Sequence, residues 1–377
     1  MRKNKLVIII LIIMVLLMIN GCEKSESVDN SIDLITASSP TLTNTVAPTN
    51  SPAIEPTTTP TIESTTTPTI TSTAEPTSTL EELSMDAYEK FIKNEMTISF
   101  DYYMPISDMD EDLYKRGSEY TLTEVLSIIT ANYFQGFDNK KIGEIDYSFI
   151  DCGNDGVNEL AICFDGMDLY NENDGSTLVY IIKYIEGKLN LCYYYETWAR
   201  SDSTLNVYGY IESGGSSGAS NHVSDSGLID KDGKWQQIVY IESELDIQQL
   251  LYGDDSNLGM IPEVSEKKGI TDGIEVNSIL IDENATNLGN ADNVKRYYTF
   301  YAYDDNWNLI NDAKLYTNSK YKDIFDEAKI PFITPGELSA MISEKEKKVG
   351  ATAEIKEGAE ITWKTLSGNM FSEYVGR

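Results

Sequence analysis

A short acidic loop carries the most specific chemistry in this sequence. Residues 151–159 read Asp-Cys-Gly-Asn-Asp-Gly-Val-Asn-Glu and lie between two apolar runs. The carboxylates of Asp151, Asp155 and Glu159 are spaced four residues apart, and a glycine that permits a sharp turn lies between the last two. Calcium binds oxygen ligands from carboxylates and carbonyls. We therefore predict a calcium site made of these three side chains and the main-chain carbonyl of Val157.

The same loop resembles a known pattern. The acidic positions, Gly156 and the following Leu160 are similar to the D-x-D-x-D-G-x-x-[DE]-L loops of FG-GAP repeats and to a loop found in bacterial surface lipoproteins. Gly153 stands where that pattern has Asp or Asn, and a single such loop does not make a propeller. A hairpin turn without metal is the alternative interpretation, because Asn, Asp and Gly are common in such turns.

The single histidine lies in a stretch rich in glycine and serine, residues 214–225. This stretch contains Ser216, Ser217, His222 and Asp225, the residue types of a hydrolase catalytic triad. Members of a catalytic triad, however, converge from separate rigid elements, and no G-x-S-x-G turn is evident here. We predict a polar loop, with ligand binding through Ser216, Ser217 and His222 as the alternative, because glycine lets a ligand approach the main chain.

Cysteines and aromatic residues offer weaker signals. Cys152, Cys163 and Cys192 are expected to be buried free thiols, with a disulfide between the first two as the alternative. One histidine and no C-x-x-C pair argue against zinc. Tyrosine and tryptophan cluster at 193–198 and at 297–307, where sheet packing or a platform for glycan or peptide would both use them.

The N-terminal sequence predicts where in the cell the protein is located. Residues 1–5 carry three positive charges, Leu6–Ile19 is an unbroken apolar run, and Ile-Asn-Gly-Cys ends at Cys22. This arrangement resembles the signal peptide and cleavage site of bacterial lipoproteins. The resemblance implies a signal peptide over 1–21, lipid attached to Cys22, and anchoring at the outer face of the cell membrane.

A spacer follows the anchor. Residues 22–81 are dominated by Thr, Ser and Pro and lack the apolar residues of a core, so we predict a disordered stalk. Removing 1–21 takes away three positive charges and no acid, so the net charge changes from −32 to −35. Such a charge argues against nucleic-acid binding.

We expect the protein to be a monomer.

Residues 82–377 are predicted to form one α+β domain, a mainly antiparallel sheet of hairpins flanked by N- and C-terminal helices. The periodicity predicts helices over 83–93, 122–133, 319–328 and 335–349, hairpins over 146–164, 178–195 and 227–241, and strands over 205–211, 295–303 and 360–364.

These features together favour a lipid-anchored extracellular binding or structural lipoprotein. Its ligand is unknown, a glycan or cell-wall component is the expected class, and calcium stabilises one loop. We lean against catalysis. The alternatives are a surface hydrolase acting on glycan or cell-wall material, and a substrate-binding or sensor lipoprotein that serves a transporter.

Overall fold

The computed structural model describes most of the chain after the threonine-rich segment. The described residues are 78–100, 114–115, 117–134, 140–167, 175–252, 258–270, 273–281, 295–366 and 369–376. All of them belong to one compact unit, Thr73–Arg377. The signal segment 1–21, the predicted acylation site Cys22 and the stalk as far as residue 77 lie outside the described residues, so these assignments stay predictions.

The first sheet is built mainly from hairpins. Its strands lie in the order β13 (Lys364–Thr365), β3 (Glu144–Ile150), β4 (Glu159–Asp165), β5 (Thr177–Ile185), β6 (Lys188–Thr197), β1 (Ile98–Ser99) and β2 (Glu119–Tyr120). Neighbours are antiparallel, apart from β1 and β6, which run parallel. The predicted hairpins over 146–164 and 178–195 are confirmed as β3–β4 and β5–β6.

The second sheet is antiparallel throughout. Its order is β12 (Tyr297–Ala302), β11 (Ile274–Leu280), β10 (Trp235–Glu244), β9 (Asn221–Ile229), β8 (Tyr210–Ser216) and β7 (Ser201–Leu205). The hairpin predicted over 227–241 is confirmed as β9–β10, with Gly233 in the turn at φ 77°. Helices and two largely antiparallel sheets together confirm the α+β class.

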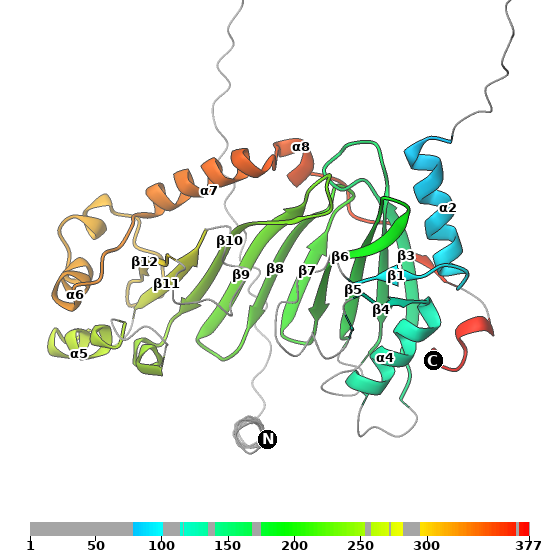
Figure 1. Ribbon diagram of the computed structural model, residues 1–377. Coiled ribbons are helices and arrows are strands. Elements are labelled where there is room, and N and C mark those ends of the chain that lie inside the picture. The colour runs from blue at the N-terminus through cyan, green and yellow to red at the C-terminus, as the bar shows by residue number, and fades with distance from the viewer. Residues whose placement is uncertain are drawn as a thin grey trace, which may run out of the picture. The chain divides into compact units, whose positions relative to one another are not determined.

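Helices pack beside both sheets (Figure 1). The α-helices are α2 (Leu80–Ile92), α4 (Leu122–Tyr133), α5 (Met260–Lys267), α6 (Lys320–Ala328), α7 (Pro335–Val349) and α8 (Ala353–Lys356), and the 3-10 helices are η1 (Ile247–Tyr252), η3 (Ala313–Tyr316) and η4 (Asn369–Phe371). α2, α4 and α7 each begin with a capping box, in which a threonine and the glutamate three residues later bond each other's main-chain N–H. These signals are local, which explains why the sequence predicted the starts of α4 and α7.

The first sheet is buried on both faces. Leu160 and Phe164 of β4 pack into a core with α2 and α4, while Ala161 and Cys163 face a second core that includes Leu205 of the second sheet. Because successive residues of a strand point to opposite faces, burial on both sides explains the continuous apolar run of β4.

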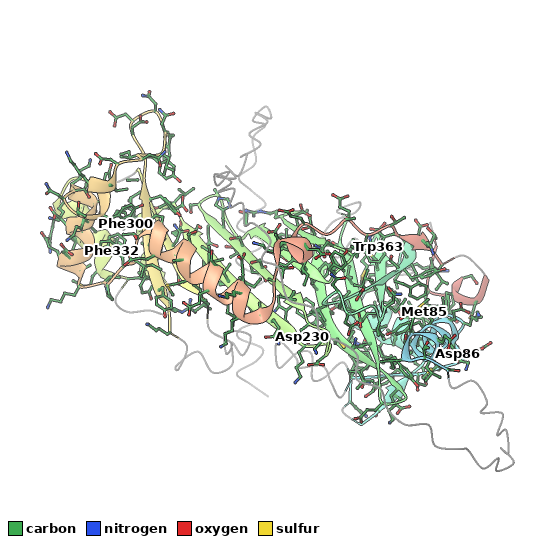
Figure 2. The ribbon with its side chains drawn as sticks, turned by 90° about the horizontal axis from the view of Figure 1, so that it is seen from above. Met85, Asp86, Asp230, Phe300, Phe332 and Trp363 are labelled. Atoms are coloured by element: carbon green, nitrogen blue, oxygen red, sulfur yellow. The ribbon has the colours of Figure 1, made fainter. Side chains whose placement is uncertain are left out.

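Helices also cover both faces of the second sheet near β11 and β12. Ile279 and Ile281 pack against α7 and α8 on one face, and Ile274 and Val276 pack against η1, α5 and α6 on the other. Rings dominate the second of these cores (Figure 2): the Phe300 ring lies 5.1 Å from the Phe332 ring in an edge-to-face arrangement.

Three predicted boundaries differ from the structure. The strand predicted over 205–211 is interrupted, because the Asn206 side chain accepts the N–H groups of Tyr208 at 2.9 Å and Tyr210 at 3.1 Å and closes a turn between β7 and β8. The strand predicted over 360–364 is β13, at residues 364–365. α2 begins at Leu80, inside the predicted stalk 22–81.

Candidate functional site

The acidic loop joins β3 to β4 and is closed by its own side chains. Asp151 Oδ1 accepts the main-chain N–H of Asp155 at 2.7 Å and that of Gly156 at 3.0 Å. Asp155 Oδ1 accepts the N–H of Val157 at 2.9 Å. Gly156 has φ 83°, which glycine adopts without strain. Two of the predicted metal ligands therefore also serve as acceptors for the loop's own main chain.

The loop connects three parts of the fold. Glu81 in the first turn of α2 binds Asn158 with both carboxylate oxygens, to the main-chain N–H at 2.8 Å and to the side-chain amide at 2.7 Å. On the other side, the N–H of Asp151 donates to the carbonyl of Val207 at 2.8 Å, in the turn between β7 and β8. The loop therefore holds α2 and the second sheet against the first sheet.

The third predicted ligand has a different partner. Glu159 is completely buried and forms an ion pair with Lys183 of β5, while its other oxygen accepts the N–H of Cys152 at 2.6 Å. Burial raises the pKa of the Glu159 carboxyl to about 7, against the opposing effect of Lys183. Sequence reasoning missed Lys183, because the pairing of β4 with β5 was needed to bring it opposite Glu159.

Two thiols border this pair. Cys152 and Cys192 are buried, and both are free, as is Cys163. A side chain added at Gly233 would meet the Cys192 sulfur at 2.7 Å and the Lys183 side chain at 3.1 Å. The pair is thus closed off by a turn of the second sheet, and burial raises the pKa of the Cys192 thiol to about 12. The prediction of buried free thiols is confirmed for all three cysteines.

The calcium prediction stays untested. Within the described ranges, no three His, Cys, Asp or Glu side chains gather in a group that could hold a metal ion. The Glu159 carboxylate is already neutralised by its ion pair with the Lys183 ammonium group. Glu159 is therefore not placed to bind calcium as well. Of the predicted calcium ligands, Asp151, Asp155 and the main-chain carbonyl of Val157 remain.

The Gly/Ser stretch is a hairpin, and the predicted loop over 214–225 is wrong. Its residues belong to β8 and β9, where Ser216 lies opposite His222. Alternating small and polar residues hid this strand pattern. Ser216 Oγ donates to the carbonyl of Gly218, and Ser217 Oγ bonds the side chain of Asn221. His222 is exposed on β9, where it lies between Ser216 of β8 and Ser243 of β10. Ligand binding by Ser216, Ser217 and His222 stays a prediction.

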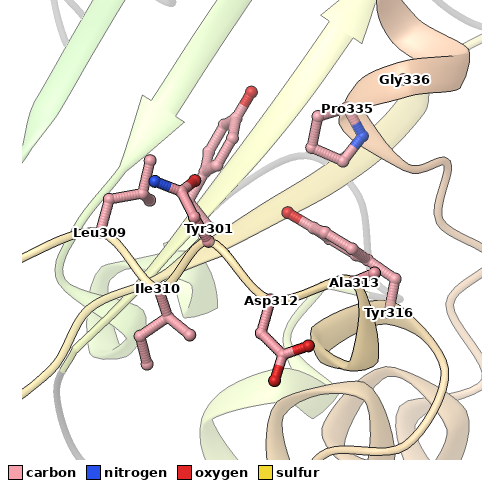
Figure 3. A pocket seen from close by; sticks show the side chains of 9 residues that line it. Tyr301, Leu309, Ile310, Asp312, Ala313, Tyr316, Pro335 and Gly336 are labelled. Carbon is pink, nitrogen blue, oxygen red and sulfur yellow. The ribbon is translucent and has the colours of Figure 1, made fainter.

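A pocket opens at the end of the second sheet, where the edge strand β12, the segment before η3 and the start of α7 meet (Figure 3). Its volume is about 290 Å³. The side chains around it are mainly aromatic, apolar or amide: Tyr301, Leu309, Ile310, Asn311, Asp312, Ala313, Tyr316, Pro335 and Gly336. The sequence pointed to this region through the aromatic cluster at 297–307, but Tyr316 and Pro335 join it through tertiary packing.

The polar groups of the pocket are suited to holding a ligand. The Tyr316 hydroxyl donates to the carbonyl of Phe300 at 2.9 Å, which leaves its oxygen as an acceptor. Burial raises the pKa of Tyr316 to about 12 and also raises that of Tyr301, so both phenols stay protonated at neutral pH. Asp312 caps η3 by accepting the N–H of Lys314 at 2.9 Å. These groups can hydrogen-bond a ligand, and neither phenol is poised to act as a base.

Comparisons with known proteins give no relative. No protein-family description matches the chain, and neither the curated proteins nor the solved structures contain a significant match. None of the helices in the described part of the chain combines the length and apolarity that spanning a membrane requires.

Proposed function

We propose that this chain is a binding lipoprotein anchored by lipid at the outer face of the cell membrane, and that its α+β domain holds a ligand away from the lipid. The proposed location rests on the apolar run Leu6–Ile19 and on Cys22, which follows it in the sequence. The stalk between Cys22 and the start of α2 supplies the distance, since chains that contain many prolines favour extended conformations.

The pocket beside β12 is the observation that favours binding. Its lining combines the rings of Tyr301 and Tyr316 with the amide of Asn311, as small-molecule sites do. Its carboxylate, Asp312, is already used as a helix cap. A binding function therefore explains the side chains that line the pocket, and it does not require any of them to act as a general base.

The anchor is tested by labelling the full-length chain with a fatty acid in a bacterial host. We expect label on the wild type in the membrane fraction, and loss of both label and membrane association in Cys22→Ala. A labelled Cys22→Ala protein, or an unlabelled wild type, refutes the lipoprotein assignment.

Binding is tested separately with the purified chain and soluble cell-wall glycan. A binding protein retains the glycan in a pull-down and leaves its chain length unchanged. Release of shorter products, measured by chromatography, would instead support the surface hydrolase.

A further inference from the structure

An exposed tryptophan stands close to the pocket in a backbone conformation that is unusual for this residue. Trp307 has φ 61°, in the left-handed region, and 61 % of its surface is exposed. For a bulky residue this conformation costs about 1 kcal/mol or more. The fold thus holds a large apolar ring in solvent despite a cost in backbone energy, and backbone outliers of this kind cluster at binding and active sites.

A tight turn fixes this conformation. Asp304 Oδ1 accepts the N–H groups of Asn306 at 2.8 Å and Asn308 at 2.9 Å. The main chain closes the same turn, since Trp307 donates to the carbonyl of Asp304 at 2.9 Å and Asp304 donates to that of Asn308 at 2.9 Å. These bonds fix the main chain at Trp307, so the direction in which the side chain leaves the turn is set before a ligand arrives.

A series of contacts links the tryptophan to a residue that lines the pocket. The Trp307 ring lies 5.9 Å from the ring of Tyr303, and Tyr303 pairs with Leu309 across the turn. Leu309 is 42 % exposed and lines the pocket together with Tyr301. Tyr303 follows β12 by one residue, and its hydroxyl donates to Glu275, the β11 residue that pairs with Tyr301. Tyr301 and Tyr303 therefore lie on the same side of the sheet. Aromatic and apolar side chains therefore lead from the exposed ring towards the pocket, beside the Glu275 carboxylate.

Charge and size narrow the ligand class. With a net charge of −32, the chain repels polyanions, which excludes acidic polysaccharides and nucleic acids as good ligands. A pocket of about 290 Å³ admits one small ring rather than an extended molecule. A proline-rich peptide docks along an aromatic-lined groove, whereas an open pocket next to a projecting ring suits a chain of cyclic units.

We infer that this surface binds a neutral glycan, with one sugar ring in the pocket and an adjacent ring stacked on Trp307. The apolar C–H face of a sugar packs on an aromatic ring, while its hydroxyls reach the Asn311 amide and the Tyr316 oxygen. The inference rests on the proposed binding function and names its ligand class.

The test uses the purified full chain, calorimetry, and two soluble probes, the β-1,4-linked oligomers of N-acetylglucosamine and of glucose. Trp307→Gly is the decisive variant, because glycine adopts φ 61° without strain and the change removes the side chain without adding any atom. We expect the wild type to bind at least one probe. We expect Trp307→Gly to bind about tenfold more weakly or not at all, with an unfolding temperature no lower than that of the wild type.

Two further proteins sharpen the result. Trp307→Phe keeps an aromatic face and should retain most of the affinity. Met370→Ala removes another exposed apolar side chain, 59 % exposed and far from β12 in sequence, and should bind as the wild type does. A peptide copying residues 57–70 of the stalk serves as the proline-containing probe.

The inference falls if neither glycan binds, if Trp307→Gly binds like the wild type, or if the stalk peptide binds and the glycans do not. In the last two cases the proposed binding function still stands, because the protein binds a ligand in another manner. Fatty-acid labelling at Cys22 is independent of all these outcomes.

Discussion

Lys183 of β5 and Glu159 of β4 form an ion pair on the face of the first sheet that packs against the second. Glu159 is wholly buried, and its carboxylate also accepts the N–H of Cys152. The desolvation of two charges is offset only by their attraction and by such hydrogen bonds. The pair therefore ties the acidic loop, the first sheet and a turn of the second sheet together.

Removing one partner of this pair should destabilise the fold strongly. We expect Glu159→Gln or Lys183→Met to lower the free energy of unfolding by about 3–5 kcal/mol, because each leaves an uncompensated buried charge or an unpaired buried group. The double variant should recover part of this loss. Urea unfolding of the four proteins gives the coupling energy.

The control for this cycle is the exposed pair of Lys90 and Asp86 on α2. Lys90→Ala should leave the free energy of unfolding almost unchanged, because solvent screens exposed pairs. Equal effects at the buried and the exposed pair would contradict the role assigned to Glu159 and Lys183.

Gly209 should be irreplaceable in the turn between β7 and β8. It has φ 77°, and an added Cβ would meet the Cys152 sulfur at 2.7 Å. We expect Gly209→Ala to cost about 2–4 kcal/mol, from backbone strain and overpacking together. Gly187, at φ 87° with open space around it, is the matched control, and Gly187→Ala should cost about 1 kcal/mol. If thermal unfolding shows the same loss for both, contact with Cys152 does not matter.

Asp225 should make stability depend on pH. Burial raises the pKa of its carboxyl to about 6, although a hydrogen bond from Ser213 opposes the shift. A raised native pKa means that the folded state holds this proton more tightly, so stability is greatest below the ordinary pKa and falls as pH rises towards 6. Asp225→Asn should remove this part of the pH dependence, on the order of 2 kcal/mol. Unfolding of both proteins in urea from pH 4 to 7 gives the comparison, and parallel curves would refute the assignment.

The calcium prediction has a direct thermal test. If the acidic loop binds calcium, adding the ion must raise the melting temperature, and a chelator must reverse the rise. Asp155→Asn should abolish the effect while Asp165→Asn, at the far end of β4, preserves it. A melting temperature that does not respond to calcium establishes the loop as a metal-free connection.

Local signals in the sequence predicted α2, α4, α6 and α7 and the hairpins β3–β4, β5–β6 and β9–β10, whereas α5 and β11 were not predicted. Thr334 with Glu337 predicted the start of α7, and Gly350, at φ 82°, its end. The sequence also predicted the turn at Glu186 and Gly187, and both residues take positive φ there, as a two-residue hairpin turn requires. Such features depend on residues within a few positions of each other, so the α+β class followed from the sequence.

Tertiary structure decided what the candidate sites contain. The sequence placed Glu159 among calcium ligands, but strand pairing set it opposite Lys183, 24 residues away. The β8–β9 hairpin was hidden because its small and polar residues lack an apolar face, and its register depends on the neighbouring strands. The pocket likewise joins Tyr301, Tyr316 and Pro335 from three separate elements. Contacts between distant segments are set by how faces pack together, and spacing along the chain does not record that.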